Sequence, residues 1–318
     1  MNTGSKLPLL VVGGPTASGK TRLAIDLAVE LGGEIICADS MQVYRGMEIG
    51  TAAPTPEERR KIPHHLFGIM EPEESFSVAR YLELAGQAVR EISERGALPV
   101  LCGGTGLYIS CLIDGMDFDP LISGNPERRV QLRALADEKG PAHLWEILKD
   151  YDPELAENLH PNNLGRVIRA IEVCELGDTP MSEWQRRAAS RESPYNVCFL
   201  ALRYADRELL YRRIDRRVEL MLEQGLLNEV RALLASGCEG TSMQAIGYKE
   251  LSAYLRGEQT LVEATEHLQR QTRRYAKRQL TWLRRDSRMK WLEPDTFESY
   301  QALFECALEL AKQQLQKF

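Results

Sequence analysis

A short glycine-rich segment near the N-terminus has the residue types and spacing of a phosphate-binding loop. It matches G-x-x-x-x-G-K-[ST], and its residues are Gly14, Pro15, Thr16, Ala17, Ser18, Gly19, Lys20 and Thr21. In such a loop, backbone N–H groups and the N-terminus of the next helix point at phosphate oxygens, and the lysine adds a positive charge. The threonine hydroxyl is placed to ligate Mg²⁺. The segment therefore predicts a site for a diphosphate with magnesium, although this pattern alone does not name the reaction.

Asp39 is a candidate for acid–base or metal chemistry at the same place. It directly follows an apolar run at residues 34–38. The carboxyl ends of parallel strands face the ligand crevice, so Asp39 is expected beside the phosphate-binding loop. A carboxylate there can act as a general base or bind Mg²⁺ through water. Capping of a following turn is the alternative, and the sequence leaves it open.

A second glycine-rich turn, GGTGLY, begins at Gly103 after the apolar run 98–102. Its glycines allow the backbone to approach a ligand closely, and Thr105 can donate a hydrogen bond there. An ordinary tight turn has the same composition. Thr105 is therefore a candidate contact whose interpretation depends on the rest of the site.

Basic residues are concentrated locally although the net charge is −6. Between Arg270 and Lys290 there are nine Lys or Arg and one acidic residue. On a helix, positions 270, 273/274, 277 and 281 share one face, which predicts a basic stripe able to follow a phosphate backbone. Arg213 and Arg217 also share a helix face, because they lie four residues apart. A solvated helix face is the alternative interpretation.

The apolar runs around these residues predict the elements that position them. Strands are expected at residues 9–13, 34–38, 65–69, 98–102, 197–203 and 289–292, and amphipathic helices at 21–31 and 78–95. Alternating strands and helices favour an α/β fold, with a P-loop-type parallel sheet and helices on both faces.

The pattern becomes entirely helical between these strands. Residues 117–126 carry turn-forming residues and are expected to be a linker. Helical patterns follow at residues 126–139, 142–150, 153–158, 163–175 and 182–191. We therefore predict a catalytic core at 1–116 and 197–318, which includes the C-terminal helices, and an inserted all-helical domain at 117–196.

Composition limits the class of protein. The chain has 318 residues, 43% hydrophobic and 27% charged, which is typical of a globular protein. The apolar run at residues 9–12 is too short for a signal peptide or a membrane span. The seven cysteines include no Cys-x-x-Cys pair, which disfavours a zinc site and a disulfide framework. A soluble cytoplasmic protein with no membrane partner is expected.

Eight motifs occur in a fixed order along the chain: GPTASGKT, ADSMQVYRGMEIGTAAP, PHHL, GGTGLY, PERR, HPNNLGRVIRAIEV, IGYKE and RRYAKRQLTWLRR. Together they resemble the bacterial tRNA dimethylallyltransferases, also called tRNA isopentenyltransferases, over residues 9–292. The resemblance implies transfer of a dimethylallyl group from dimethylallyl diphosphate to the exocyclic amine of the adenosine 3′ of the tRNA anticodon. It implies Mg²⁺ as the cofactor and the anticodon stem-loop as the partner, and we expect a monomer.

The resemblance also implies roles for individual residues. The loop from Gly14 to Thr21 would hold the diphosphate and Mg²⁺, with Lys20 and Thr21 as catalytic residues. Asp39 would be the general base and a further candidate ligand of Mg²⁺. Arg213 or Arg217 would complete the diphosphate clamp. With the basic stripe included, tRNA contacts are expected at Asp39, Ser40, Met41, Gln42, Thr105, Arg129, Gly165, Arg166, Val167, Ile168, Arg169, Arg274, Lys277 and Arg278.

Three other functions are compatible with the phosphate-binding loop. An adenylate isopentenyltransferase would use the same donor on a free nucleotide and would not require the helical block. A small-molecule P-loop kinase would turn over ATP without a prenyl donor. A non-enzymatic RNA-binding protein would keep its function when Asp39 is replaced by alanine.

Overall fold

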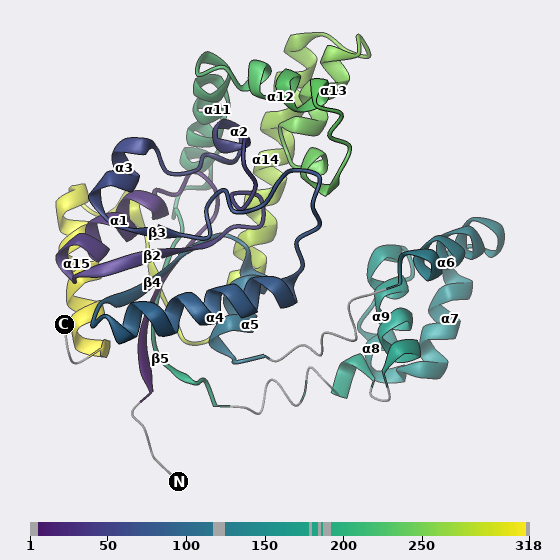
Figure 1. Cartoon of the computed structure of the whole chain (residues 1–318), viewed down its shortest axis with the longest axis horizontal. Coiled ribbons are helices and arrows are strands. Elements are labelled where there is room, and N and C mark those ends of the chain that lie inside the picture. The colour runs from purple at the N-terminus through teal and green to yellow at the C-terminus, as the bar shows by residue number, and fades with distance from the viewer. Residues whose placement is uncertain (1–5, 117–124, 178–179, 184–185, 187–191, 316–318) are drawn as a thin grey trace. The chain divides into compact units, whose positions relative to one another are not determined.

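A parallel sheet lies between layers of helices (Figure 1). The two glycine-rich turns and Asp39 occur where three of its strands end. The computed structural model describes residues 6–116, 125–177, 180–183, 186 and 192–315. All pairings in the six-stranded sheet are parallel, in the order β3-β2-β4-β1-β5-β6. The strands are β1 (Leu7–Gly13), β2 (Gly33–Ala38), β3 (His64–His65), β4 (Leu98–Gly103), β5 (Tyr195–Leu202) and β6 (Met289–Leu292).

Each face of the sheet has its own apolar core. Leu10 and Val12 point to one face, where α1 (Lys20–Glu30) and α15 (Tyr300–Leu315) pack. Leu9 and Val11 alternate to the other face, which is covered by α4 (Val78–Glu94) and α5 (Gly106–Ile113). Because both faces are buried, β1 is a continuous apolar run and shows no polar alternation.

The predicted α/β fold class is confirmed, and one predicted strand was too long. The strand expected at 65–69 contains only His64–His65 in the structure. Leu66 and Gly68 have φ angles of 65° and 57°, which are incompatible with a regular strand. The chain leaves the sheet edge there, and only an isolated bridge between Tyr44 and Met70 continues the pairing.

A second layer of helices packs around the segment that follows β2. The helices are α11 (Arg207–Glu223), α12 (Leu226–Ala235), α13 (Tyr248–Leu255) and α14 (Leu261–Leu283). Their apolar faces enclose Val43, Tyr44 and Met47 in a third core. The short helices α2 (Glu48–Thr51) and α3 (Pro56–Lys61) continue this segment. The residues that follow Asp39 are thus fixed by packing against helices far away in sequence.

The chain divides into two compact units, Met1–Ile113 with Ser193–Phe318, and Asp114–Glu192. The second unit contains α6 (Pro126–Lys139), α7 (Pro141–Tyr151), α8 (Pro153–Glu157) and α9 (Leu164–Leu176) around a core of its own. Asn125 caps α6 by accepting a hydrogen bond from the Arg128 N–H, and Pro126 occupies the first helical position. Most of the predicted linker 117–126 and of the predicted helix 182–191 lies outside the described residues.

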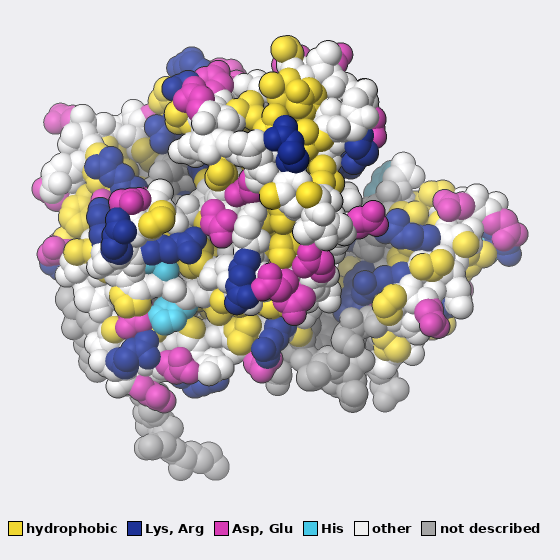
Figure 2. All heavy atoms as spheres, turned by 45° about the horizontal axis from the view of Figure 1, so that its top comes forward, with side chains coloured by type: hydrophobic (Ala, Val, Ile, Leu, Met, Phe, Trp, Pro, Cys, Tyr) yellow, Lys and Arg dark blue, Asp and Glu magenta, His cyan; other side chains and the backbone are white. Residues whose placement is uncertain are grey.

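Charges of both signs are interspersed on the face drawn in Figure 2, so this face offers no large basic surface. Within the described part of the chain, no helix has the length and apolar character needed to cross a membrane.

Candidate active site

The loop between β1 and α1 curls back on itself as the sequence pattern predicts. Ser18 N–H donates to the Pro15 carbonyl at 3.3 Å, and Lys20 Nζ donates to the same oxygen at 3.4 Å. Gly14 has a φ of 153°, and a Cβ there would lie 2.8 Å from Ser18 Oγ, so a glycine is required. The Ser18 hydroxyl is buried and has no hydrogen-bond partner in the described residues. A buried polar atom of this kind is expected where a ligand completes the bonding.

Two cationic side chains converge beside this loop. Burial lowers the pKa of the Lys20 ammonium, and the charge of Arg217 lowers it further, while Cys102 and Asp39 act in the opposite direction. Burial likewise lowers the pKa of Arg217, and Asp39 opposes this shift. Two desolvated cations near a single carboxylate favour the binding of an anion.

Arg213 contacts the loop directly from α11. Its Nε donates to the Ala17 carbonyl at 3.0 Å, and its guanidinium lies over the Tyr204 ring at 5.5 Å. Ala17 also packs against Leu210 and Ile214 of the same helix. The two arginines left open by the sequence therefore differ: Arg213 holds the loop backbone, whereas the charge of Arg217 lowers the pKa of Lys20.

Asp39 begins the segment that leaves the sheet. Its Oδ1 accepts a hydrogen bond from the Met41 N–H at 2.9 Å, so the local turn that the sequence left as an alternative is present. Gln42, three residues on, donates through Nε2 to the carbonyls of Thr51 and Ala52, at 2.9 and 3.1 Å. The Gln42 amide is therefore anchored to the end of α2.

Thr105 joins the turn after β4 to the segment after β2. Its N–H donates to the Ala38 carbonyl at 3.0 Å, and its Oγ1 accepts from the Ser40 N–H at 3.0 Å. Because β2 and β4 are neighbours in the sheet, their carboxyl ends meet. Thr105 thereby fixes the backbone on either side of Asp39.

A pocket lies beside the loop and has two kinds of wall. Lys20, Thr21, Asp39 and Gln42 contribute polar groups. The remaining lining residues are mainly apolar: Ile25, Ile35, Pro54, His64, Phe67, Cys102 and Gly103. Burial lowers the pKa of His64, which favours the neutral imidazole. The pocket therefore combines a cationic end with an apolar wall.

The basic stripe on α14 is smaller than predicted. Arg270, Arg274, Lys277 and Arg278 are exposed. Arg273 is instead half-buried and forms an ion pair with Asp215 of α11 at 2.5 Å. Its charge is neutralised, and it connects the two helices, so it does not belong to the exposed stripe.

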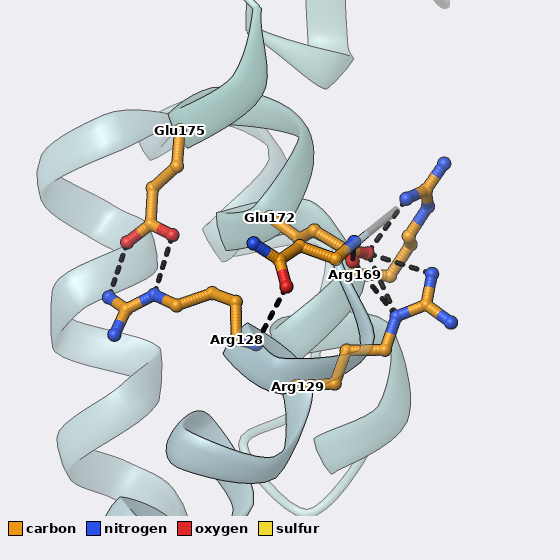
Figure 3. A network of polar contacts seen from close by, with 6 residues as sticks. Arg128, Arg129, Arg169, Glu172 and Glu175 are labelled. Atoms are coloured by element: carbon orange, nitrogen blue, oxygen red, sulfur yellow. Dashed lines mark hydrogen bonds and ion pairs between the residues drawn. The ribbon is translucent and has the colours of Figure 1, made fainter. Parts of the chain in front are cut away.

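The candidate tRNA residues of the helical unit fall into two groups. Gly165 and Arg166 are exposed at the start of α9, whereas Val167 and Ile168 are buried in the core of the unit. Arg129 of α6 and Arg169 of α9 share one carboxylate, that of Glu172 (Figure 3). Within the stretch 165–169, the side chains of Val167 and Ile168 therefore act through packing.

Comparison with known proteins identifies the family. The IPP transferase family model matches residues 42–286. A tRNA dimethylallyltransferase from Caldanaerobacter subterraneus subsp. tengcongensis is 45% identical over 306 residues, which cover 95% of this chain and 97% of that protein. The chain belongs to the tRNA dimethylallyltransferase family. This confirms the family predicted from the eight motifs.

Solved structures agree with this family assignment. The full-length tRNA isopentenylpyrophosphate transferase of Bacillus halodurans has a TM-score of 0.74 and 42% identity, with 98% of each chain covered. A eukaryotic dimethylallyltransferase acting on tRNA has a TM-score of 0.79 and 29% identity, over 93% of this chain and 78% of that one. The similarity therefore extends over nearly the whole of this chain.

Two residues of α14 at the site were not singled out from the sequence. Gln279 is buried, accepts from the Thr16 N–H at 2.9 Å and donates to the Gly104 carbonyl at 3.0 Å. Tyr275 is half-buried, and burial, together with the charge of Asp39, raises the pKa of its hydroxyl. The sequence did carry a signal for Gln279. It is a polar residue on the helical face of Ala276 and Leu283, which is buried.

Proposed function

We propose that this chain transfers the dimethylallyl group of dimethylallyl diphosphate to the exocyclic amine of the adenosine 3′ of the tRNA anticodon. The observation that carries the proposal is the two-sided pocket. Its cationic end suits a diphosphate, and its apolar wall, with Ile35 and Phe67, suits a short hydrocarbon. Membership of the tRNA dimethylallyltransferase family supports the same donor and acceptor.

In the proposed reaction, the bond between the allylic carbon and the diphosphate oxygen breaks, and the amine nitrogen forms a bond to that carbon. Lys20, Arg217 and the loop N–H groups stabilise the negative charge that develops on the leaving diphosphate, an effect commonly worth several kcal/mol. Asp39 accepts the proton that the amine loses. Thr105 and Gln42 hold the segment around Asp39 in place. The adenine must leave its stack to reach this site.

Magnesium is part of the proposal, because the pocket offers suitable ligands. Thr21 and Asp39 both line it and present hard oxygen donors. Among the described residues, no group of three or more His, Cys, Asp or Glu side chains is arranged to hold a metal. Mg²⁺ is usually bound through one or two side-chain oxygens together with substrate phosphates, which fits this arrangement. Bound there, it would neutralise charge on the leaving diphosphate.

The test is prenyl transfer to an unmodified anticodon stem-loop in the presence of dimethylallyl diphosphate and Mg²⁺. Mass analysis of the nucleosides should find one added dimethylallyl group on the target adenosine. Asp39→Asn should lower kcat by roughly 10²- to 10⁴-fold while the affinity for the stem-loop is retained. Asp26→Asn, a change of the same kind on α1, is the control. Transfer to free AMP alone, ATP turnover without the donor, or no prenylated adenosine would overturn the proposal.

A further inference from the structure

Glu172 is a fully buried carboxylate at the centre of a basic cluster in the helical unit (Figure 3). Its oxygens accept from Nε and Nη2 of Arg129 at 3.0 Å and from Nη1 of Arg169 at 2.7 Å. The backbone N–H of Asn125 donates to Glu172 Oε1 at 2.5 Å. One carboxylate of α9 therefore fixes two arginines and the residue that caps α6.

The two arginines are held but remain accessible. The side chains of Arg129 and Arg169 are 45% and 36% exposed, whereas that of Glu172 is 0% exposed. A guanidinium has five N–H donors, and Arg129 uses only Nε and Nη2 on Glu172. Glu172 therefore orients two partly exposed guanidinium groups on one surface. Such a surface suits the phosphate groups of a nucleic acid.

Burial favours the neutral acid and would raise the pKa of Glu172 alone. The hydrogen bonds from Arg129, Arg169 and Asn125 outweigh burial and lower the pKa. The carboxylate is therefore ionised at neutral pH and can keep both guanidiniums in place. A buried charge is tolerated when it is paired and fully hydrogen-bonded, as it is here.

We propose that Glu172 is a positioning residue for tRNA: it holds Arg129 and Arg169 side by side as a clamp for backbone phosphates. The inference rests on the proposed function, because it takes tRNA as the partner. Glu172 touches no substrate itself and acts through the two arginines. Without this carboxylate, the Arg129 guanidinium would lose the hydrogen bonds that orient it and would have to be ordered at the moment of binding.

A matched control lies one turn further along α9. Glu175 accepts from Arg128 of α6 through two hydrogen bonds, at 2.8 and 2.6 Å. Replacing either glutamate by glutamine removes one negative charge, from the same helix, beside an arginine of α6. Only Glu172 holds the arginines that we assign to tRNA. The two variants therefore separate positioning from overall charge.

The experiment compares the tRNA affinity of the whole chain with that of Glu172→Gln and Glu175→Gln. If charge alone mattered, loss of a carboxylate would strengthen binding to a polyanion in both variants. Positioning predicts the opposite for Glu172→Gln: the Kd and KM for tRNA rise roughly tenfold, with kcat and the KM for dimethylallyl diphosphate unchanged. Glu175→Gln should bind as tightly as the unmodified chain or more tightly. Equal or tighter binding by Glu172→Gln would overturn the proposal.

Arg129→Gln provides a second measurement that separates positioning from damage to the fold. If Glu172 acts through Arg129, adding Glu172→Gln to Arg129→Gln should weaken tRNA binding by much less than it does alone. Fully additive losses would contradict the proposal. Glu172→Asp keeps the charge and should restore part of the affinity if Glu172→Gln folds poorly. An unmodified chain that prenylates no tRNA would instead refute the proposed function, and tRNA binding would still test Glu172.

Discussion

Gln279 connects the phosphate-binding loop to the turn after β4 through one amide group. Its oxygen accepts from the Thr16 N–H, and its nitrogen donates to the Gly104 carbonyl. The Thr16 N–H is therefore engaged by the protein, and other N–H groups of the loop are left for the phosphates. A Cβ at Gly104 would lie 2.1 Å from Gln279 Nε2, so the position of the Gln279 side chain requires a glycine at residue 104. The motif RRYAKRQLTWLRR thus contributes a structural amide in addition to its basic residues.

Gln279→Leu should damage the diphosphate site because the side chain is buried and both of its partners are backbone groups. We expect a loss of about 1–3 kcal/mol in the free energy of unfolding, since two buried polar groups lose their partner. The KM for dimethylallyl diphosphate should rise roughly tenfold. Urea unfolding and steady-state kinetics measure the two effects. Gln271→Leu, on the same helix and less buried, is the control, and an equal effect there would contradict this role of Gln279.

Glu34 gives a pH-dependent contribution to stability at the start of β2. Burial alone would raise its pKa, but hydrogen bonds from Arg95 and His65 outweigh burial and lower it below the reference value of 4.5. A lowered pKa in the folded state means that stability is present above pH 4.5 and is lost as the pH falls through the folded-state pKa. Glu34→Gln should therefore cost about 1 kcal/mol at pH 7, and this cost should shrink as the pH falls through the folded-state pKa of Glu34.

Urea unfolding at several pH values tests this prediction for Glu34. Glu30→Gln, an exposed position at the end of α1, is the control and should follow the pH dependence of the unmodified chain. A Glu34→Gln variant with the same pH dependence as the unmodified chain would refute the assignment.

At the residue scale, the sequence predicted which candidate residues lie together better than it predicted the contacts that support them. The loop pattern and the position of Asp39 after a strand are local features, so Lys20, Thr21 and Asp39 could be placed in one pocket without a structure. Gln279 is 263 residues away from Thr16 in the chain. A local sequence pattern cannot reveal a contact between residues this far apart in the chain. The same reason explains why Arg273 was assigned to the basic stripe, since its partner Asp215 lies on another helix.

At the element scale, α2 depends on a carboxylate from α12. Glu229 accepts from the Ile49 and Gly50 N–H groups, both at 2.9 Å, and these are donors of the first turn of α2. Tyr248 donates its hydroxyl to the same carboxylate at 2.6 Å. The other end of α2 receives the Gln42 amide. The helix layer therefore determines the position of Gln42 in the pocket.

Glu229→Gln should loosen α2 and with it Gln42. The glutamine cannot accept through both side-chain atoms, so one N–H of α2 loses its partner. We expect a loss of about 1–2 kcal/mol in the free energy of unfolding and a several-fold lower kcat/KM for tRNA. Glu219→Gln removes an exposed ion pair on α11 and should have little effect. If both variants keep full kcat/KM for tRNA, α2 does not position the acceptor.

The strands could be predicted as elements, but their ends could not. Residues 289–292 (MKWL) were predicted with the correct bounds, because Arg288 precedes them and Glu293 and Pro294 follow them directly. The predicted strand at 65–69 was wrong in length, because Leu66 adopts a left-handed conformation that its residue type does not suggest. Tertiary contacts of the neighbouring segment, such as the hydrogen bond from Gly68 N–H to the Gln42 carbonyl, determine that turn.

At the scale of the whole molecule, the all-helical unit enters and leaves the α/β unit at one place. Ser193 Oγ donates to the carbonyl of Ile113, the last residue of α5, so the two ends of the insertion are in contact. Of the described residues between Asp114 and Glu192, none belongs to the two cores of the sheet. In its described residues, the α/β unit therefore has its own cores. The two residues that flank the insertion, Ile113 and Ser193, are in contact with each other.

Replacing residues 114–192 by a linker of about four Gly and Ser residues should leave this unit folded, because the linker only needs to bridge two residues already in contact. The variant should unfold cooperatively. Diphosphate with Mg²⁺ should raise its Tm as it does for the whole chain, because Lys20 and Arg217 remain. Its affinity for the anticodon stem-loop should fall by at least 100-fold, since the paired clamp of Arg129 and Arg169 is gone, a loss of about 3 kcal/mol. Thermal unfolding with and without diphosphate and a tRNA-binding titration measure these effects. An unchanged stem-loop affinity would place tRNA binding within the α/β unit and would contradict the role given to the helical unit.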